Sequence, residues 1–440
     1  MFLYHVRIAL KSLRRSLGLS AVIVGGIALG IGVASLFSTV RHSMAKDPIP
    51  GKSRVLHWVR LDSWDPARAH PNPDGIPPQI TFRDAMEIMK SDIPARQTAM
   101  FRANLYVFPP DPKVARPKRT TVRLCFADFF PMFEVPFKYG AGWDKPADQG
   151  PEPVVVLGEE INDLLFGGAD SVGKTVRIED REFRVVGVLD TWRPAIKFYD
   201  ITQNAIQPPE QVFMPFNLVR PMQIRTAGNI DGWKTSGGRG FEGLLASDQN
   251  WVQFWAELRD AGARQRYVDF LKAYVMEQKK AGRFPRPLRV EVTPLMAWMD
   301  SQNVTPPQVT ATWVVSLLFL AVCSLNLMGL LLAKFLARAP EIGVRRALGA
   351  SRRDVFVQHV VEAEMVGLIG GVLGVLLAVG AVAVVNGWAM TTLNRGDLFR
   401  FDGTMVLAAA GLSLAAGLVA GAYPAWRVCR IPPAIHLKLQ

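Results

Sequence analysis

Long apolar runs alternate with polar stretches along the chain. The run at residues 18–40 and the later runs at 309–333, 360–385 and 403–424 each cover the roughly 20 residues that a helix needs to cross a bilayer core. Residues 41–308, between the first two runs, are polar, rich in proline and broken into short stretches. This pattern predicts an α-helical membrane protein with four transmembrane helices and a large α+β domain between helices 1 and 2.

Short elements of both kinds are expected in the domain 41–308. Alternating positions at 153–158, 174–180 and 182–190 predict strands, whereas helical spacing over 251–281 predicts a helix. One segment inside this domain, GADSVGKT, fits the nucleotide-binding pattern GxxxxGK[ST] letter for letter. A working phosphate loop needs a helix after it, and the residues that follow alternate like a strand, so we expect a tight turn there.

Basic residues gather beside the apolar runs. The chain of 440 residues carries a formal net charge of +13. The positive-inside rule explains this better than nucleic-acid binding, because many of the Lys and Arg residues flank the runs. We expect a bacterial inner-membrane protein with both termini cytoplasmic. The amphipathic N-terminal helix 1–17, the segment 334–359 and the tail 425–440 would lie in the cytoplasm, and the domain 41–308 and the loop 386–402 in the periplasm.

The first apolar run is longer than the roughly 7–15 residues of a signal-peptide core, so we expect a retained span. A cleaved signal peptide is the alternative. Three cysteines lie in three different segments and six histidines stand singly, so the sequence suggests neither an intrachain disulfide nor a metal site.

Small residues within the spans predict close helix packing. Gly26 with Gly30, and Gly417 with Gly421, have the GxxxG spacing that lets a second helix approach. The third run adds Gly367, Gly370, Gly371 and Gly374. The alternative is that these residues reflect only the usual composition of membrane helices. An amide in lipid needs a partner, so Asn326 in the second run is expected to bond across a helix interface.

Two carboxylates, Glu362 and Glu364, stand near the cytoplasmic end of the third run. Burial of an ionised carboxylate there is costly unless it is paired. Ion pairing with nearby arginines, or capping of the helix, is therefore the favoured hypothesis, and a proton relay is the alternative.

A basic amphipathic segment, EIGVRRALGASRRD, precedes the third run. Its apolar positions Ile342, Val344, Ala347 and Leu348 would seat in the membrane interface. Its arginines would stay in water beside lipid phosphates or a protein partner; they are Arg345, Arg346, Arg352 and Arg353.

Together with the later GGVLG, this segment resembles the signature of the MacB/FtsX-type permeases, the membrane subunits of type VII ABC systems. A second stretch, EPVVVLGEEINDLLFGGADSVGKTVRIEDREFRVVGVLD, is similar to the MacB periplasmic core. The resemblance implies a coupling helix docked on an ATPase. The residues assigned to that surface are Glu341, Gly343, Arg345, Arg346, Gly349, Ala350 and Arg353. A basic helix that merely holds topology is the alternative.

The resemblance also implies a function. The chain would be a dimeric, non-catalytic permease subunit that transmits motion, with no catalytic, cofactor or metal residues of its own. Because this chain has no credible phosphate loop, ATP and Mg would be bound by an ABC ATPase acting in trans. A second permease copy or a paralogue would complete the dimer, and no nucleic acid would be involved.

Tripartite efflux is the favoured activity within this family. It would expel peptides, antibiotics or other amphiphiles through a periplasmic adaptor and an outer-membrane channel. The alternatives are Lol-like extraction of lipoproteins and FtsX-like transmembrane regulation of cell-wall hydrolases. The periplasmic domain is larger than FtsX needs, which favours efflux.

Overall fold

A computed structural model describes residues 8, 12, 17–110, 116–150, 152–202, 204–234, 238–393 and 395–430. The chain divides into two compact units. Met1–Lys46 and Thr305–Gln440 form the helical unit, and Asp47–Val304 form the sheet unit. Most of the predicted helix 1–17, and the end of the predicted tail 425–440, lie outside the described residues.

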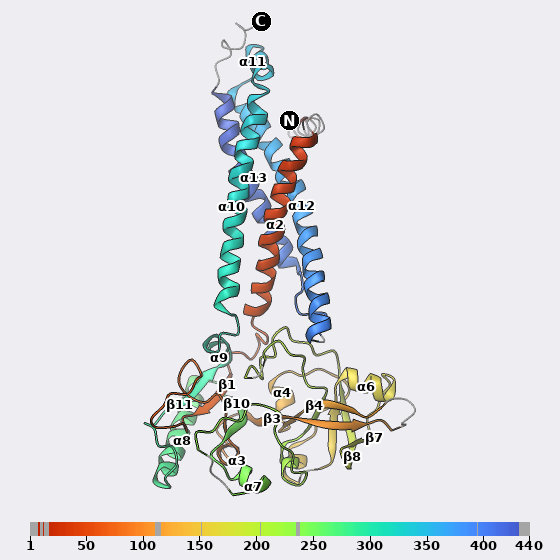
Figure 1. Ribbon diagram of the computed structural model, residues 1–440, viewed down its shortest axis with the longest axis vertical. Helices are drawn as coiled ribbons and strands as arrows, with labels where there is room; N and C mark the ends of the chain where they lie inside the picture. Colours follow the sequence, from red (N-terminus) through yellow and green to blue (C-terminus); the bar gives the residue numbers. More distant parts are fainter. Residues whose placement is uncertain are drawn as a thin grey trace. The chain divides into compact units, whose positions relative to one another are not determined.

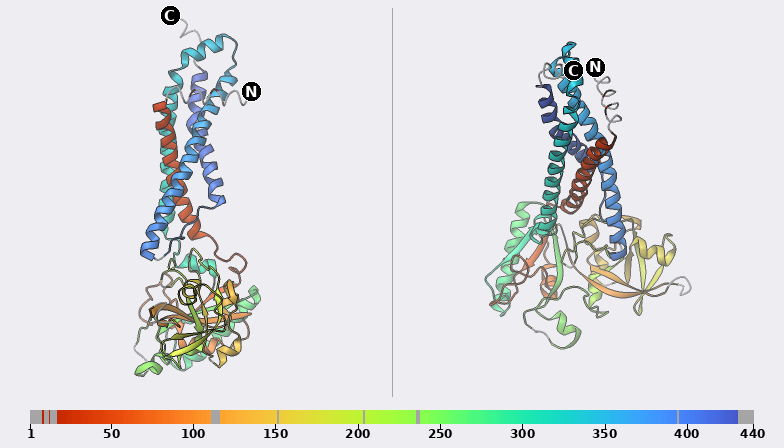
Figure 2. Two further views of the ribbon diagram at one scale, coloured as in Figure 1. Left: turned by 90° about the vertical axis from the view of Figure 1, so that its right-hand side faces the viewer. Right: turned by 45° about the horizontal axis from the view of Figure 1, so that its top comes forward.

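The helical unit contains four long helices that run side by side (Figures 1 and 2). They are α2 (Leu17–Ala45), α10 (Pro307–Leu336), α12 (Arg352–Leu393) and α13 (Gly403–Cys429). Among the described residues, these four are long and apolar enough to cross a membrane. The predicted four spans are thus confirmed. A short helix, α11 (Ala339–Ala347), links α10 to α12.

The helices extend past the apolar runs that predicted them. In particular, α12 begins within the expected segment 334–359 and ends within the expected loop 386–402. Helix α12 packs against α2 and α13, and α10 packs against the same two helices. The core between them is built from branched apolar side chains such as Ile27, Leu327 and Val366.

The sheet unit is built on one mixed sheet (Figure 1). Among the described residues this sheet has eleven strands, in the order β11-β1-β10-β3-β4-β9-β6-β8-β5, with β2 paired to β10 and β7 paired to β3 and β8. The strands are β1 (Leu56–Leu61), β2 (Ile80–Thr81), β3 (Arg96–Phe108), β4 (Lys118–Cys125), β5 (Phe137–Gly140), β6 (Val154–Leu157), β7 (Thr175–Ile178), β8 (Arg181–Leu189), β9 (Val212–Pro215), β10 (Asn250–Glu257) and β11 (Val290–Pro294). The β4–β9 and β6–β8 pairs are parallel. The predicted α+β domain is confirmed.

Short helices cover this sheet. They are α3 (Phe82–Ile88), α4 (Phe129–Met132), α5 (Lys145–Gln149), α6 (Glu159–Phe166), α7 (Gly240–Leu245), α8 (Ala261–Lys280), α9 (Leu295–Ser301) and the 3₁₀ turn η1 (Phe216–Val219). The longest, α8, buries Tyr267, Leu271 and Val275 in the core of the unit.

The segment that resembles a phosphate loop forms a turn, as predicted. Gly168 and Gly173 have φ of +79° and +84°, the left-handed region that glycine adopts at low cost. The next residues form β7, and the Gly173 amide donates to the Val185 carbonyl of β8 at 2.8 Å. No helix N-terminus follows the turn to receive a phosphate.

The helix predicted over 251–281 is wrong in its first third. Residues 250–257 form β10, which is buried on both faces and includes Trp251 and Trp255. Aromatic side chains suit a strand sandwiched between layers, and this outweighed the helix-like spacing. Helix α8 begins only at Ala261, and the carboxylate of the preceding Asp260 caps it by accepting a hydrogen bond from the Ala263 amide at 2.8 Å.

A fully buried charge cluster fastens the loop between β8 and β9 to the sheet. Arg123 of β4 donates to Asp200 and, at 2.5 Å, to Glu210, and Lys197 Nζ lies 2.6 Å from Glu210. Burial disfavours the ionised carboxylates, but Arg123 and Lys197 outweigh it and hold the pKa values of Asp200 and Glu210 below their usual range. The loop is thereby held by charge rather than by regular structure.

Candidate functional site at the α11 end of the helical unit

Helix α11 ends in a defined backbone motif. Gly349 has φ of +104°, and its amide donates to the Arg346 carbonyl at 3.2 Å. The Ala350 amide donates to the Arg345 carbonyl at 3.1 Å. This pair of bonds is a Schellman motif, which requires a left-handed residue at the position of Gly349. Gly349 and Ala350 therefore shape the end of the helix.

The next helix starts immediately. The Ser351 hydroxyl oxygen accepts a hydrogen bond from the Asp354 amide at 3.1 Å, and the hydroxyl donates to the Asp354 carboxylate at 2.6 Å. Ser351 thus caps α12. The end of α11 and the start of α12 are thus both capped by hydrogen bonds, and only residues 348–351 lie at the corner between them.

One face of α11 is buried and the opposite face is exposed. Ala339, Ile342 and Gly343 are buried. Two apolar side chains point outward, with Val344 50% and Leu348 84% exposed. The prediction placed Ile342 in the same interfacial stripe as Val344 and Leu348; the structure separates them.

The arginines of the segment have different surroundings. Arg345 is exposed and donates to Gln358 of α12 at 3.3 Å. Arg346 is half-buried and donates to the Cys429 carbonyl at the end of α13 at 3.2 Å, a favourable place for a cation. Glu341 and Arg353 are exposed. The outward face therefore combines Glu341 and Arg345 with the apolar Val344 and Leu348.

Beneath α11, Glu362 is only 2% exposed and is the centre of a charge cluster. Its carboxylate lies 2.9 Å from Lys334 Nζ and 3.6 Å from Arg338 Nη1, both on or just after α10. The Ser12 hydroxyl donates to the same carboxylate, and Arg338 donates to Ser12. The expected ion pairing of Glu362 is present, although its closest partner is Lys334 rather than an arginine.

A cavity of about 290 Å³ opens beside this cluster, between α11, α12 and Ser12. His359 lines it, with its ring edge-on to Phe335 and Nδ1 2.8 Å from the Val355 carbonyl. Glu364 differs from Glu362: it is half-buried, and its carboxylate oxygens have no hydrogen-bond partner among the described residues.

Glycines bring α2 close to α12 and α10. A methyl group at Gly370 would lie 2.7 Å from Ile27 Cγ2, and one at Gly374 would lie 2.9 Å from the Ala28 carbonyl oxygen. On α2 itself, a methyl group at Gly30 would lie 2.9 Å from Leu320 of α10. A methyl group at Gly26 would lie 3.5 Å from Leu327 Cδ2, an ordinary van der Waals contact.

A second set of glycines joins α12 to α13. A methyl group at Gly421 would overlap the Ala363 Cβ, and one at Gly371 would overlap the Ser413 hydroxyl, which donates to the Gly367 carbonyl at 2.7 Å. A methyl group at Gly367 would lie 3.2 Å from Gly417 Cα, and a methyl group at Gly417 would lie 3.1 Å from the Glu364 carboxylate.

Asn326 does not lie between helices of this chain. It is exposed, whereas α10 buries the opposite face, with Leu320, Leu327 and Leu331, against its neighbours. The expected bond across a helix interface is therefore absent among the described residues. The amide points away from the helical unit.

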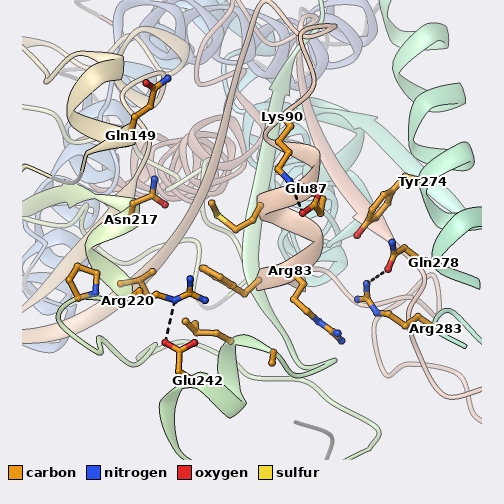
Figure 3. Close-up of a pocket in the computed structure, with 16 residues that line it drawn as sticks. Arg83, Glu87, Lys90, Gln149, Asn217, Arg220, Glu242, Tyr274, Gln278 and Arg283 are labelled. Carbon is orange, nitrogen blue, oxygen red and sulfur yellow. Dashed lines mark hydrogen bonds and ion pairs between the residues drawn. The ribbon is translucent and has the colours of Figure 1, made fainter. Parts of the chain in front are cut away.

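The sheet unit contains a large cleft that the sequence did not indicate. It measures about 900 Å³, and Phe82, Met86 and Leu245 give it an apolar floor. Figure 3 shows two ion pairs at its edges, Lys90–Glu87 at 2.8 Å and Arg220–Glu242 at 3.2 Å. The residues come from segments far apart in the chain, so no local motif could have signalled them.

A second cavity of about 430 Å³ shares Met86, Lys90, Gln149 and Asn217 with this cleft. It reaches Asp148, where burial raises the carboxyl pKa to about 6, against hydrogen bonds from the Ala127 amide and the Trp143 indole that lower it. Each cavity has a volume within the range of small-molecule sites and a lining of both apolar and polar side chains.

Two family descriptions match the chain in order. The MacB-like periplasmic core domain matches residues 20–267, more than half of the chain, and the FtsX-like permease C-terminal domain matches residues 313–433. The chain belongs to the MacB/FtsX-type ABC permeases. The permease resemblance predicted from two separated motifs is thus confirmed. Four apolar helices and a MacB-like periplasmic core domain make the permease a multi-pass inner-membrane protein.

Curated relatives of the permease are longer. The macrolide export ATP-binding/permease protein MacB of Bdellovibrio bacteriovorus is 25% identical over 310 residues, which cover 69% of this chain and 41% of that protein. The MacB protein of Nitrobacter winogradskyi is 24% identical over 434 residues, which cover 97% of this chain and 58% of that protein. The permease therefore spans about half the length of the curated relatives it matches.

Another relative is the pyoverdine export ATP-binding/permease protein PvdT of Pseudomonas syringae, 25% identical over 307 residues, which cover 70% of this chain and 41% of that protein. Among solved structures, the periplasmic region of MacB from Actinobacillus actinomycetemcomitans aligns with 59% of this chain and 96% of its own. The TM-score is 0.37 and the identity 12%. This structural likeness is too weak to carry an argument.

Proposed function

We propose that this permease couples ATP hydrolysis by a separate ABC ATPase to movement of its periplasmic domain. ATP and Mg would be bound by the ATPase, and the permease itself would be a non-catalytic subunit of a dimeric transporter. Both termini and α11 would lie in the cytoplasm, as the flanking Lys and Arg residues favour.

The outward face of α11 is the observation that carries this proposal. Leu348 is 84% exposed and Val344, one turn before it, is 50% exposed, so the two form an adjacent apolar pair on the outward face of this short helix. Charged Arg345 and Glu341 flank them on the same exposed face. An apolar anchor that becomes buried when a partner docks, surrounded by a charged rim, is typical of a protein interface. The capped corner at Gly349 and Ser351 would pass movement of this face on to α12.

Efflux is the activity that we favour. The relatives named above are described as exporters of macrolides and of pyoverdine. The cleft of the sheet unit suits amphiphiles such as peptides or antibiotics. A periplasmic adaptor and an outer-membrane channel would complete the path. Lol-like lipoprotein extraction and FtsX-like regulation of cell-wall hydrolases are the alternatives, and lipoproteins or hydrolases that co-purify with the chain would favour them.

The test is capture of the tagged permease from native membranes in a mild detergent, with mass spectrometry of what remains bound. Wild type should retain an ABC ATPase. The double variant Arg345→Glu/Leu348→Asp should lose it, because the change places an added negative charge on the apolar anchor and reverses the charge of the rim. Permease-stimulated ATP hydrolysis should fall in parallel.

Arg400→Glu is the matched control, because Arg400 is an exposed arginine in the segment between α12 and α13, outside α11. It should keep the ATPase. If the α11 variant retained the ATPase and its stimulated hydrolysis as fully as the control, the proposed coupling face would be wrong.

A further inference from the structure

The cavity of about 430 Å³ in the sheet unit carries negative charge that its own cations do not neutralise. Three cationic side chains line it, and each is paired with a carboxylate: Lys90 with Glu87 at 2.8 Å, Arg96 with Glu257 at 3.2 Å and Lys145 with Asp128 at 3.4 Å. Two further carboxylates of the lining, Asp92 and Asp148, form no ion pair among the described residues. At neutral pH this cavity therefore lacks a cation.

Asp148 is the buried one of these two carboxylates, with only 5% of its surface exposed. It accepts hydrogen bonds from the Ala127 amide and the Trp143 indole, both at 2.8 Å, but both donors are neutral. A buried carboxylate without a counter-ion is costly to ionise, and for this reason its pKa is raised to about 6. A cation in the cavity would supply the missing partner.

Gln97 lines the same cavity and is 7% exposed. Its amide nitrogen donates to the carbonyls of Met89 and Ser91, at 2.9 and 2.8 Å, and these two bonds fix the orientation of the amide. The amide oxygen has no hydrogen-bond partner among the described residues. Buried acceptors without a partner are rare, because the lost hydrogen bond to water costs free energy. Gln97 is therefore a second group of the lining that requires a donor.

An organic cation suits this lining better than a metal ion. In the described part of the chain, no set of three His, Cys, Asp or Glu side chains is placed to hold a metal. An ammonium group carries both a positive charge and several N–H donors. One such group can pair with a carboxylate and donate to an amide oxygen at the same time.

The adjoining cleft of about 900 Å³ offers room for an apolar body. The two cavities share Lys90 and Asn217, which Figure 3 shows among the residues that line the cleft. Each of the four cations that line the cleft is paired: Arg83 with Asp248, Lys90 with Glu87, Arg220 with Glu242 and Arg283 with Asp84. An anionic group would find no free cation there, whereas the apolar floor remains available to a ligand.

We infer that the two cavities bind an amphiphile that carries an amine, with its ammonium group against Asp148 and Gln97 and its apolar body on the floor of the cleft. This inference rests on the proposed efflux function and names the class of substrate. The uncompensated charge of Asp148 and Asp92 attracts a cationic amphiphile and repels an anionic one. Asp148 is then the residue that determines charge specificity.

Two matched fluorescent probes test this charge preference. Both carry a dansyl group on a short alkyl chain, which ends in an ammonium group in one probe and in a carboxylate in the other. Fluorescence anisotropy with the full chain in nanodiscs of zwitterionic lipid measures their binding. The ammonium probe should bind saturably at neutral pH, and the carboxylate probe at least about tenfold more weakly.

Three variants test the site. Asp148→Asn should weaken binding of the ammonium probe by at least about tenfold, because it removes the buried partner of the charge. Asp92→Asn, at an exposed carboxylate, should weaken it by about twofold to fivefold, and this variant preserves the test if Asp148→Asn does not fold. Asp180→Asn is the matched control, because Asp180 is exposed and lies outside the lining of both cavities. It should bind like wild type.

The pH dependence separates a direct contact from a structural role. Because Asp148 must be ionised to pair with the ammonium group, the affinity should fall about tenfold between pH 7 and pH 5, and Asp148→Asn should lose this dependence. The other titratable groups that face Asp148 are Cys125, Asp128 and Lys145. Burial raises the pKa of the Cys125 thiol, which stays neutral in this range, and Asp128 and Lys145 carry opposite charges and pair with each other.

Three results would each overturn the inference: equal binding of the two probes, no saturable binding of the ammonium probe, or wild-type affinity in both Asp148→Asn and Asp92→Asn. Capture of the ATPase separates this result from the proposed coupling. An ATPase recovered with a permease that does not bind the ammonium probe would refute only the ligand site. Binding of the ammonium probe without any ATPase would support the site and count against the coupling function.

Discussion

Replacement of Gly421 by alanine should separate α13 from α12. The added methyl group would overlap Ala363 Cβ, whereas carbon atoms in contact normally lie about 3.5–4.0 Å apart. Both atoms are on helix surfaces with no long side chain that could rotate away, so the helices themselves must move apart by roughly 1–2 Å.

The expected cost of Gly421→Ala is about 1–3 kcal/mol, the usual range for overpacking a well-filled core. For a unit of this size, that corresponds to roughly 2–4 °C in the unfolding midpoint for each kcal/mol. Thermal unfolding of the purified permease in lipid nanodiscs measures it. Gly411→Ala on the same helix is the matched control, because no atom lies within 4 Å of its Cβ position.

The double variant Gly421→Ala/Ala363→Gly makes the test sharper. It moves the methyl group from one helix to the other, so most of the lost stability should return. Equal midpoints for Gly421→Ala and Gly411→Ala would refute the reasoning. A double variant that is no more stable than Gly421→Ala would show that the cost comes from a source other than this contact.

Three further predictions concern single sites. Arg123→Met should cost about 3–5 kcal/mol of unfolding free energy, because it removes a buried cation that neutralises the carboxylates of Asp200 and Glu210. The control Arg184→Met, at an exposed ion pair, should cost at most about 1 kcal/mol. Burial raises the pKa of the Asp148 carboxyl from 3.8 to about 6. The protonated carboxyl therefore contributes about 2–3 kcal/mol to the free energy of unfolding below pH 3.8, and this contribution is lost as the pH rises through about 6. Asp148→Asn should flatten the dependence of unfolding free energy on pH in this range, as followed by tryptophan fluorescence, and an unchanged slope would contradict the assignment. Gly349→Ala should cost about 1–2 kcal/mol through its left-handed backbone and speed hydrogen exchange in the last turn of α11, whereas Gly349→Asn should stay near wild type; identical exchange in both would argue against the motif.

The spans could be predicted from the sequence because length and hydropathy determine which segments can cross a bilayer. The family could be predicted because two separated motifs carry the resemblance. Specific partners could not. Glu362 required a counter-ion, but only the packing of α10 against its neighbours shows that Lys334 supplies it. Helical spacing misled at β10, because burial on both faces removes the alternation that normally reveals a strand.

Asn326 is a second residue whose partner could not be predicted from the sequence. The sequence required a partner for its amide, yet the helices of one chain do not provide it. Such a residue can be identified only after the buried face of its helix is known, since the pattern of apolar residues is nearly uniform around α10.

Helix α12 is a single rod of 42 residues, about 63 Å long at roughly 1.5 Å per residue. It contains no proline, and its glycines are clamped against α2 and α13 where they are buried. At one end it is joined to α11 by a corner with both helix ends capped. If α11 receives the ATPase as proposed, a movement of α11 would pass directly into α12, and the far end of that continuous helix, at Leu393, would move with it.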